Sequence, residues 1–315
     1  MKDSVESCIS RRGFIGGLAA AAGSAALAGC QSAERQTCAN ERMLFGVCVG
    51  NDLKSVKELK ELGYDFFEGS AGQTLMPTKD GDDWKRQRDA ILAAGLPLRC
   101  CNGFLPGEFR LTGHNAAWDK PLAYAEKVCR RADEVGMQYV VFGSGGARQV
   151  PRADKKKPAS PDDIKRGFEQ FTGFCEKLAA RIADCKMTVV IEPLRPKECN
   201  LINYVWESLQ IVEKIGSPRI QQLADLFHMA EGGEKPESIV KAGALLKHCH
   251  VATPGGRKAP GLEAPGVLLD YFKALRDIGY TGGVSCECSW GPKGSDKRKT
   301  RANALALMRE WAGLA

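Results

Sequence analysis

Four side chains that could bind a metal ion stand at the ends of successive apolar segments in the second half of the chain. They are Glu192, Asp225, His250 and Glu287, separated by 33, 25 and 37 residues. Each spacing has the length of one strand and one helix. Two glutamates, an aspartate and a histidine form an oxygen-rich donor set that suits a hard divalent cation better than a thiolate-bound metal. We expect one divalent metal site, with Mn²⁺ favoured and Mg²⁺ or Co²⁺ as alternatives.

Histidines are scarce in this sequence and gather near these acids. The chain has four, and three of them are His228, His248 and His250. Alternate residues of a strand share one face, so His248 and His250 should point the same way. His250 is nearer the carboxyl end of its segment and is the better candidate ligand, whereas His248 suits a core position. Glu68, which closes an earlier apolar segment, either lines the same site or caps a loop.

The elements that must position these residues follow a regular alternation from residue 43 onward. Eight short apolar or β-branched segments are expected strands: Met43–Val49, Tyr64–Glu68, Leu96–Cys101, Gln138–Gly143, Met187–Glu192, Ile220–Asp225, Leu245–Val251 and Gly283–Cys288. Amphipathic segments between them are expected helices, among them Leu53–Leu62, Ala117–Val135, Pro161–Cys185, Tyr204–Ile215 and Leu268–Ile278. Ser160 followed by Pro161 is typical of a helix start. Gly63, Gly136 and Gly279 are typical of helix ends.

Strict alternation of strands and helices predicts a parallel sheet. Eight units in about 270 residues match the size of a closed (β/α)₈ barrel. A doubly wound open sheet is the alternative, but it would favour a glycine-rich phosphate loop after the first strand, and residues 46–51 contain no G-x-G-x-x-G motif. We therefore predict the α/β class, with a single TIM barrel over residues 43–315. In such a barrel the chemistry lies where the strands end.

The first 30 residues are typical of an export signal. Lys2, Arg11 and Arg12 precede an apolar run over residues 13–29 that is too short, and too rich in small residues, for a good membrane span. Residues 10–15 resemble the twin-arginine motif, and residues 27–30 resemble a lipobox ending in Cys30. Residues 31–42 are expected to form a polar tether. We expect an exported protein of the cell envelope or periplasm, anchored to the membrane only by a lipid on Cys30.

Composition narrows the function classes further. The chain is 43% hydrophobic and 26% charged, with a net charge of +7. Its basic residues are not interleaved with aromatic ones, which argues against nucleic acid as a partner. Of 13 cysteines, Cys8 and Cys30 belong to the signal, so an odd number remains. Most of these lie in apolar segments as small hydrophobic residues, and no C-x-x-C spacing occurs, so we predict mostly reduced thiols and no thiolate zinc site.

The site motifs resemble the xylose isomerase-like barrel superfamily, and within it the ketose 3-epimerase and sugar phosphate isomerase/epimerase branch. The likeness covers most of residues 43–290 and is strongest in residues 191–194 with Glu198, in 225–229, in 248–250 and at Glu287; residues 102–106 are similar to the family's third-strand loop. The resemblance implies that Glu192, Asp225, His250 and Glu287 bind the metal and that Glu192 and Glu287 transfer protons. It also implies that His228, Glu198 and Arg257 contact substrate hydroxyls. One departure is Thr253, which stands where the epimerases usually carry an acid, with Arg257 displaced by one residue.

Three functions remain open at this level. A metal-dependent sugar isomerase or epimerase would move a proton next to a carbonyl through an enediolate. A metal-dependent lyase would cleave 3-keto-glycosides by β-elimination, which suits an envelope protein. A non-enzymatic sugar-binding lipoprotein is the competing class, but it would not need so many converging ligands. The partner is a small sugar or glycoside, Phe104 and Trp290 are candidate apolar walls for its ring, and a homodimer is compatible with the sequence.

Overall fold

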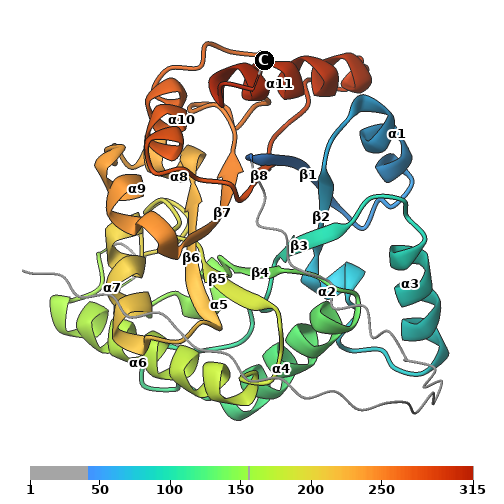
Figure 1. Ribbon diagram of the computed structural model, residues 1–315. Coiled ribbons are helices and arrows are strands. Elements are labelled where there is room, and N and C mark those ends of the chain that lie inside the picture. The colour runs from blue at the N-terminus through green and yellow to red at the C-terminus, as the bar shows by residue number, and fades with distance from the viewer. Residues whose placement is uncertain (1–41, 155–156, 315) are drawn as a thin grey trace, which may run out of the picture. The chain divides into compact units, whose positions relative to one another are not determined.

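The computed structural model describes residues 42–154 and 157–314 (Figure 1). The predicted signal over residues 1–30, its Cys30, and the tether except for Arg42 lie outside this part of the chain. Eight parallel strands close into a barrel in the order β1 to β8, with helices around it, which confirms the predicted TIM barrel. The strands are β1 Leu44–Gly50, β2 Phe66–Ser70, β3 Leu98–Asn102, β4 Tyr139–Phe142, β5 Thr188–Ile191, β6 Ile220–Asp225, β7 Leu246–Val251 and β8 Gly283–Cys286. Each predicted strand is correct to within two residues at each end.

Helices of two kinds follow the strands. The long ones cover the outside of the barrel: α1 Ser55–Leu62, α3 Asp82–Leu92, α4 Asp119–Glu134, α6 Pro161–Arg181, α7 Val205–Ile215, α10 Leu268–Asp277 and α11 Lys297–Trp311. The short ones stand in the connections: α2 Ala71–Thr74, α5 Gly145–Arg148, α8 Leu226–Glu231, α9 Glu237–Ala242 and the 3₁₀ turn η1 Gly243–Leu245. Helix α6 ends four residues before its predicted end, because the chain turns where the Cys185 N–H donates to the Ile182 carbonyl. Among the helices described, none is both long and apolar enough to span a membrane.

The predicted helix ends have the expected local chemistry. The Ser160 hydroxyl accepts the Asp163 N–H at the start of α6, as a helix-capping serine does. Gly63, Gly136 and Gly279 have φ values of 86°, 75° and 64°, in the left-handed region where glycine is unstrained. The residue after each of these glycines donates its N–H back to the last turn of the helix. The chain then reaches β2, β4 and β8 within a few residues of these glycines.

The strands are buried on both faces, as parallel strands covered by helices must be. Two glycines on neighbouring strands make room for large side chains. Gly46 of β1 is in register with Phe66 of β2, and a Cβ at Gly46 would lie 2.2 Å from the Phe66 ring. Gly283 of β8 makes the same kind of room beside His248. All ten cysteines in the described part of the chain are free, and eight of them are buried.

Replacing Gly46 with alanine should destabilise the barrel by about 2 kcal/mol, because the buried Phe66 ring has no space into which it can retreat. Urea denaturation of the full-length protein measures this change in the free energy of unfolding. Gly72→Ala is the matched control: it lies in a helix, its added Cβ would come no nearer than 3.7 Å to another residue, and its effect should stay within about 0.5 kcal/mol. Equal stability of the two variants would contradict the close packing between β1 and β2.

Candidate functional site

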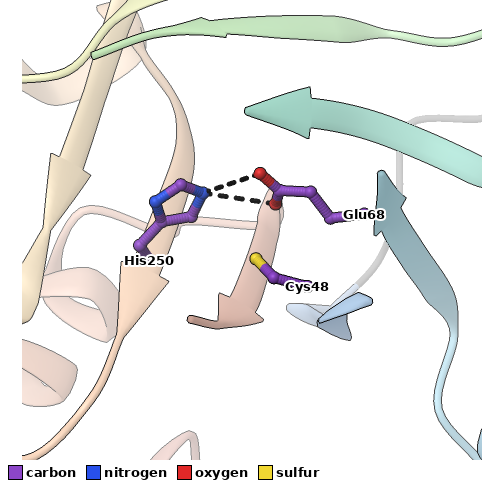
Figure 2. A group of neighbouring side chains, drawn as sticks. All are labelled: Cys48, Glu68 and His250. Carbon is purple, nitrogen blue, oxygen red and sulfur yellow. Dashed lines mark hydrogen bonds and ion pairs between the residues drawn. The ribbon is translucent and has the colours of Figure 1, made fainter. Parts of the chain in front are cut away.

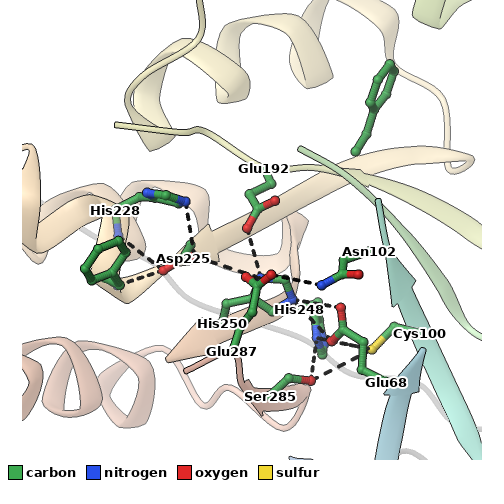
Figure 3. Close-up of polar contacts among 12 residues, drawn as sticks. Glu68, Cys100, Asn102, Glu192, Asp225, His228, His248, His250, Ser285 and Glu287 are labelled. Atoms are coloured by element: carbon green, nitrogen blue, oxygen red, sulfur yellow. Dashed lines mark hydrogen bonds and ion pairs between the residues drawn. The ribbon is translucent and has the colours of Figure 1, made fainter. Parts of the chain in front are cut away.

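The four predicted ligands meet at the carboxyl ends of the last four strands (Figure 3). Glu192 directly follows β5, Asp225 ends β6, His250 belongs to β7, and Glu287 directly follows β8. One possible ligand atom from each lies within 4.8 Å of those of the other three. The structure thus brings together all four side chains that sequence spacing alone had singled out.

His250 is the centre of this cluster. Its Nδ1 lies 2.9 Å from a Glu192 oxygen, 3.1 Å from a Glu287 oxygen and 4.0 Å from an Asp225 oxygen. The imidazole is fully buried, and Asp225 and Glu192 are almost so. One ring nitrogen therefore faces three carboxylates in a space with little water.

The two carboxylate oxygens of Asp225 make different contacts. Its Oδ1 accepts the backbone N–H groups of Phe227 and His228 at 2.8 and 3.2 Å, which caps the start of α8. Its Oδ2 turns to the cluster, 3.5 Å from His228 Nε2 and 3.5 Å from Arg257 Nη2. Because the cap fixes the side chain through Oδ1, Oδ2 is held toward His250.

Glu192 is held through its backbone and by the shape of its surroundings. The guanidinium of Arg148, which is fully buried, donates to the Glu192 carbonyl at 2.8 Å and also to the carbonyls of Phe142 and Ile202. These bonds join the ends of β4 and β5 to the loop that leads to α7. The carboxylate lies against Gly143, where an added Cβ would stand 2.2 Å from Glu192 Oε2. Only glycine leaves the carboxylate in this place.

Glu287 is held by side chains rather than by a helix cap. Asn102, at the end of β3, donates its amide N–H to Glu287 Oε1 at 2.9 Å. Arg257 donates to Glu287 Oε2 at 2.7 Å and to the Glu287 carbonyl at 3.2 Å. Glu287 keeps more than a quarter of its side chain exposed, so it forms the solvent-facing edge of the cluster.

The electrostatics of the cluster reflect burial opposed by close charges. Burial raises the pKa of Glu192, and the imidazole of His250 offsets this only in part. Burial acts in the same direction on Asp225, but the imidazoles of His228 and His250 and the guanidinium of Arg257 outweigh it and lower the pKa. For His250, burial favours the neutral ring, yet the surrounding carboxylates raise its pKa well above the usual range. A positive charge at the point that His250 Nδ1 faces would therefore stabilise the site.

A divalent cation would supply that charge. Glu68, the last acid in contact with His250, adds a fourth carboxylate to Glu192, Asp225 and Glu287. Within the described ranges, Arg257 is the one arginine or lysine that pairs with any of these four. Carboxylate oxygens and an imidazole nitrogen are ligands of Mn²⁺, Mg²⁺ and Co²⁺. The donor set, its spacing and its uncompensated charge all fit such an ion.

The three predicted substrate-contacting residues lie beside the cluster. His228 is buried, and neither of its ring nitrogens has a hydrogen-bond partner among the described residues; its Nε2 lies 3.9 Å from Glu198. Glu198 also lies 3.7 Å from Arg257. Arg257 has a strained φ of 47° and its guanidinium stacks over the Phe227 ring. His228 Nε2 also lies 3.5 Å from Asp225 Oδ2, so a buried imidazole without a hydrogen bond stands between two carboxylates, which indicates a place where a ligand hydroxyl could bind.

Two predicted apolar walls have a different place in the structure. Phe104 is fully buried in the core and packs edge to face against Phe142, 5.1 Å between ring centres, so it cannot contact a sugar. Trp290 is also buried, with the Arg301 guanidinium over its ring. Both aromatics support the wall of the barrel.

The sequence analysis left the role of some site residues undecided and did not identify others. Glu68 lines the site, which settles the choice between a site residue and a loop cap, and it carries the signal that identified the others, an acid at the end of an apolar segment. Asn102 was part of a matched loop but had no assigned role. Arg148 and Gly143 gave no signal, because a basic residue and a glycine in a Gly-rich loop usually face solvent.

Comparison with known proteins agrees with the barrel fold. Residues 56–311 match the family described as xylose isomerase-like TIM barrel. The chain belongs to this family. Within it, the sequence is 30% identical over 112 residues to D-psicose 3-epimerase of Enterocloster bolteae, a match that covers 35% of this chain and only 36% of that epimerase.

Solved structures of sugar epimerases share the whole xylose isomerase-like barrel. D-psicose 3-epimerase from Clostridium cellulolyticum H10, solved with D-tagatose, has a TM-score of 0.70 at 19% identity, over 86% of this chain and 99% of that one. The 3-keto-D-glucoside 4-epimerase of E. coli has a TM-score of 0.69 at 20% identity, over 85% of this chain and 100% of that one. At such low identity these likenesses establish the fold alone.

Replacing Gly143 with alanine should displace the Glu192 carboxylate while leaving the barrel folded, because the added methyl meets only the end of a flexible side chain. We expect divalent-metal binding to weaken on the order of 10-fold or more, measured by titration calorimetry of Mn²⁺ into chelator-treated full-length protein. Gly107→Ala, in the loop after β3, adds a methyl that meets only ordinary contacts and should bind the metal as the wild type does. Unchanged affinity in Gly143→Ala would show that Glu192 is not held where the structure has it.

Proposed function

We propose that this protein is a divalent-metal-dependent sugar isomerase or epimerase that moves a proton next to a carbonyl group. The observation that carries the proposal is the convergence of Glu192, Asp225, His250 and Glu287 on one buried point. A sugar-binding lipoprotein without activity has no use for such a cluster, since carboxylates crowded in a dry site cost stability unless their charge is used.

The four side chains would hold the cation through three carboxylates and the His250 Nδ1. When bound, a divalent cation supplies Lewis-acid stabilisation of negative charge that develops on the carbonyl oxygen. The proton itself is moved by the chain's own groups. Glu192 and Glu287 reach the same point from β5 and from β8, so they can face a bound sugar from two sides. One carboxylate removes the proton beside the carbonyl, which leaves an enediolate, and the other, as its carboxylic acid, delivers its own proton. Delivery to the opposite face of the same carbon inverts it, and delivery to the neighbouring carbon isomerises the sugar.

The substrate would enter from the Glu287 side. Arg257, Glu198 and Glu287 each keep roughly a third of their side chains exposed, whereas Asp225 and His250 keep almost none. Arg257 and Glu198 offer a donor and an acceptor for sugar hydroxyls, and His228, whose ring nitrogens make no hydrogen bond to the described residues, offers a third contact deeper in the site. The names of the similar proteins suggest a keto sugar or a 3-keto-glycoside as the substrate class.

Proton abstraction can be measured directly. Full-length protein loaded with Mn²⁺ or Mg²⁺ should incorporate deuterium from D₂O beside the carbonyl of a keto-hexose or a 3-keto-glucoside, detected by NMR of the recovered sugar. Glu192→Gln and Glu287→Gln should each lower kcat/KM about 10²- to 10⁴-fold, because each removes a proton-transfer group. Glu213→Gln, exposed on α7, is the control and should keep full activity.

The products distinguish the related reactions. An inverted or isomerised sugar supports the proposal as stated. Release of the aglycone from a 3-keto-glycoside would instead identify β-elimination by the same carboxylates. Tight sugar binding with no deuterium incorporation, by wild type and glutamine variants alike, would refute an enzymatic role and leave a binding protein.

We also propose that the protein acts outside the cytoplasm, on the basis of its first 30 residues. Replacing both Arg11 and Arg12 with lysine should block export, and Cys30→Ala should move the exported protein from the detergent phase to the aqueous phase in a Triton X-114 partition, because the lipid is lost. Cys38→Ala is the matched control, since it lies in the tether. Detergent partition that does not depend on Cys30 would contradict the lipid anchor.

A further inference from the structure

Glu68 is a fully buried carboxylate on the inner side of the candidate metal centre. Its Oε1 and Oε2 lie 3.1 and 3.2 Å from His250 Nε2, the ring nitrogen that faces away from the other carboxylates (Figure 2). In the part of the chain that the structure describes, no arginine or lysine pairs with Glu68. Its charge is therefore stabilised mainly through the two imidazoles that it contacts.

Other groups hold Glu68 in place. His248 Nε2 lies 3.2 Å from Glu68 Oε2, and the Cys100 thiol donates to the same oxygen at 3.0 Å. His248 Nε2 in turn lies 3.1 Å from the Ser285 hydroxyl. Burial raises the pKa of the Cys100 thiol, which keeps its proton available for this bond. The carboxylate is thus fixed from β3 and β7 and cannot rotate away from His250.

We propose that Glu68 is a positioning residue that accepts the Nε2–H of His250 and so directs the His250 Nδ1 lone pair at the metal. The inference rests on the proposed metal-dependent function. A neutral imidazole carries one N–H, and the nitrogen that binds a metal must be the other one. Nδ1 faces Glu192 and Glu287, so it is the nitrogen that would bind the metal. The proton must then stay on Nε2, and Glu68 is its acceptor. Such a partner fixes both the tautomer and the ring plane of a metal-binding histidine.

The same buried groups could be read as a second cation site. Donor atoms of Cys48, Glu68 and His250, and those of Glu68, Cys100 and His248, also lie within 4.8 Å of one another. Two observations favour hydrogen bonding instead. The Cys100 thiol donates to Glu68 Oε2 at 3.0 Å, which is the role of a protonated hydrogen-bond donor and not of a thiolate ligand. Both oxygens of Glu68 also lie within hydrogen-bond distance of a partner as they stand. The number of ions bound per chain separates the two cases.

Glu68→Gln tests the inference, because the amide keeps the size of the side chain and removes its charge. Calorimetric titration of chelator-treated full-length protein with Mn²⁺ should give one ion per chain in the wild type and on the order of 10- to 100-fold weaker binding in the variant. Ser285→Ala is the matched control: it is equally buried, but its hydroxyl contacts His248 and Cys100 and makes no hydrogen bond to Glu68 or His250. Its affinity should stay within about threefold of the wild type.

A spectroscopic readout reports on the tautomer itself. In protein labelled with ¹⁵N-histidine and loaded with Mg²⁺, His250 should show a protonated Nε2 with a strongly downfield N–H signal and an unprotonated Nδ1. This signal should move upfield or vanish by exchange in Glu68→Gln and persist in Ser285→Ala. A general loss of structure would not produce that difference, and the thermal unfolding of the metal-free variants checks it independently.

The outcomes are distinct. Wild-type affinity in a folded Glu68→Gln variant with an unchanged N–H signal would overturn the positioning role and leave the proposed function intact. A wild-type His250 that carries its proton on Nδ1 would overturn it even if the variant failed to fold. Two ions per chain, one of them lost in Glu68→Gln, would make Glu68 a ligand instead. A wild type that binds no divalent ion would refute the proposed function together with the inference.

Discussion

Repulsion among four carboxylates around one buried imidazole is the constraint that the rest of the site must satisfy. The nearest carboxylate oxygens lie 2.9 to 4.0 Å from a ring nitrogen of His250; they belong to Glu68, Glu192, Asp225 and Glu287. A pair of like charges about 4 Å apart costs roughly 4 kcal/mol at an effective dielectric constant of 20. Several such pairs would match the whole folding stability of a domain, typically about 5–15 kcal/mol. A fold that keeps these groups together therefore needs a positive charge among them.

The barrel supplies rigid positions for this costly arrangement. Asp225 and His250 are register partners on β6 and β7, and His250 is in register with Ser285, two residues before Glu287. Parallel register thus sets the backbones of Asp225 and His250 at one level, with Glu287 two residues farther along its strand direction. The remaining freedom is removed locally, by the helix cap on Asp225, by Arg148 on the Glu192 carbonyl, and by the Asn102 amide on Glu287. Sites built on strand ends in this way hold their geometry better than sites built on loops alone.

The contrast between predictable and unpredictable residues follows from the same physics. The fold and the convergence of the four candidate ligands could be predicted because buried parallel strands are continuous apolar segments, which makes an acid at their ends stand out. Glu68 gave the same local pattern, but whether it faced the site or capped a loop depended on β7 lying across the barrel from β2. Arg148 could not be recognised, because an arginine shortly after two glycines becomes a buried donor to carbonyl groups only when β4, β5 and the following loop come together. Gly143 is needed for space alone, and sequence does not reveal which side chain will use that space.

Under the proposed function, the position of Arg257 would link cation binding to substrate binding. Its guanidinium pairs with Asp225 and Glu287, two of the carboxylates that would hold the cation, and its backbone is strained to allow this. A cation bound by these carboxylates shares their charge, which weakens both ion pairs. The guanidinium stays supported by the Phe227 ring, so it remains at the open side of the site rather than moving into solvent. Weaker pairing with these carboxylates would leave its N–H groups more available for the oxygens of a substrate. The residue that partly balances the site without a metal is therefore the one that the bound metal would release for recognition.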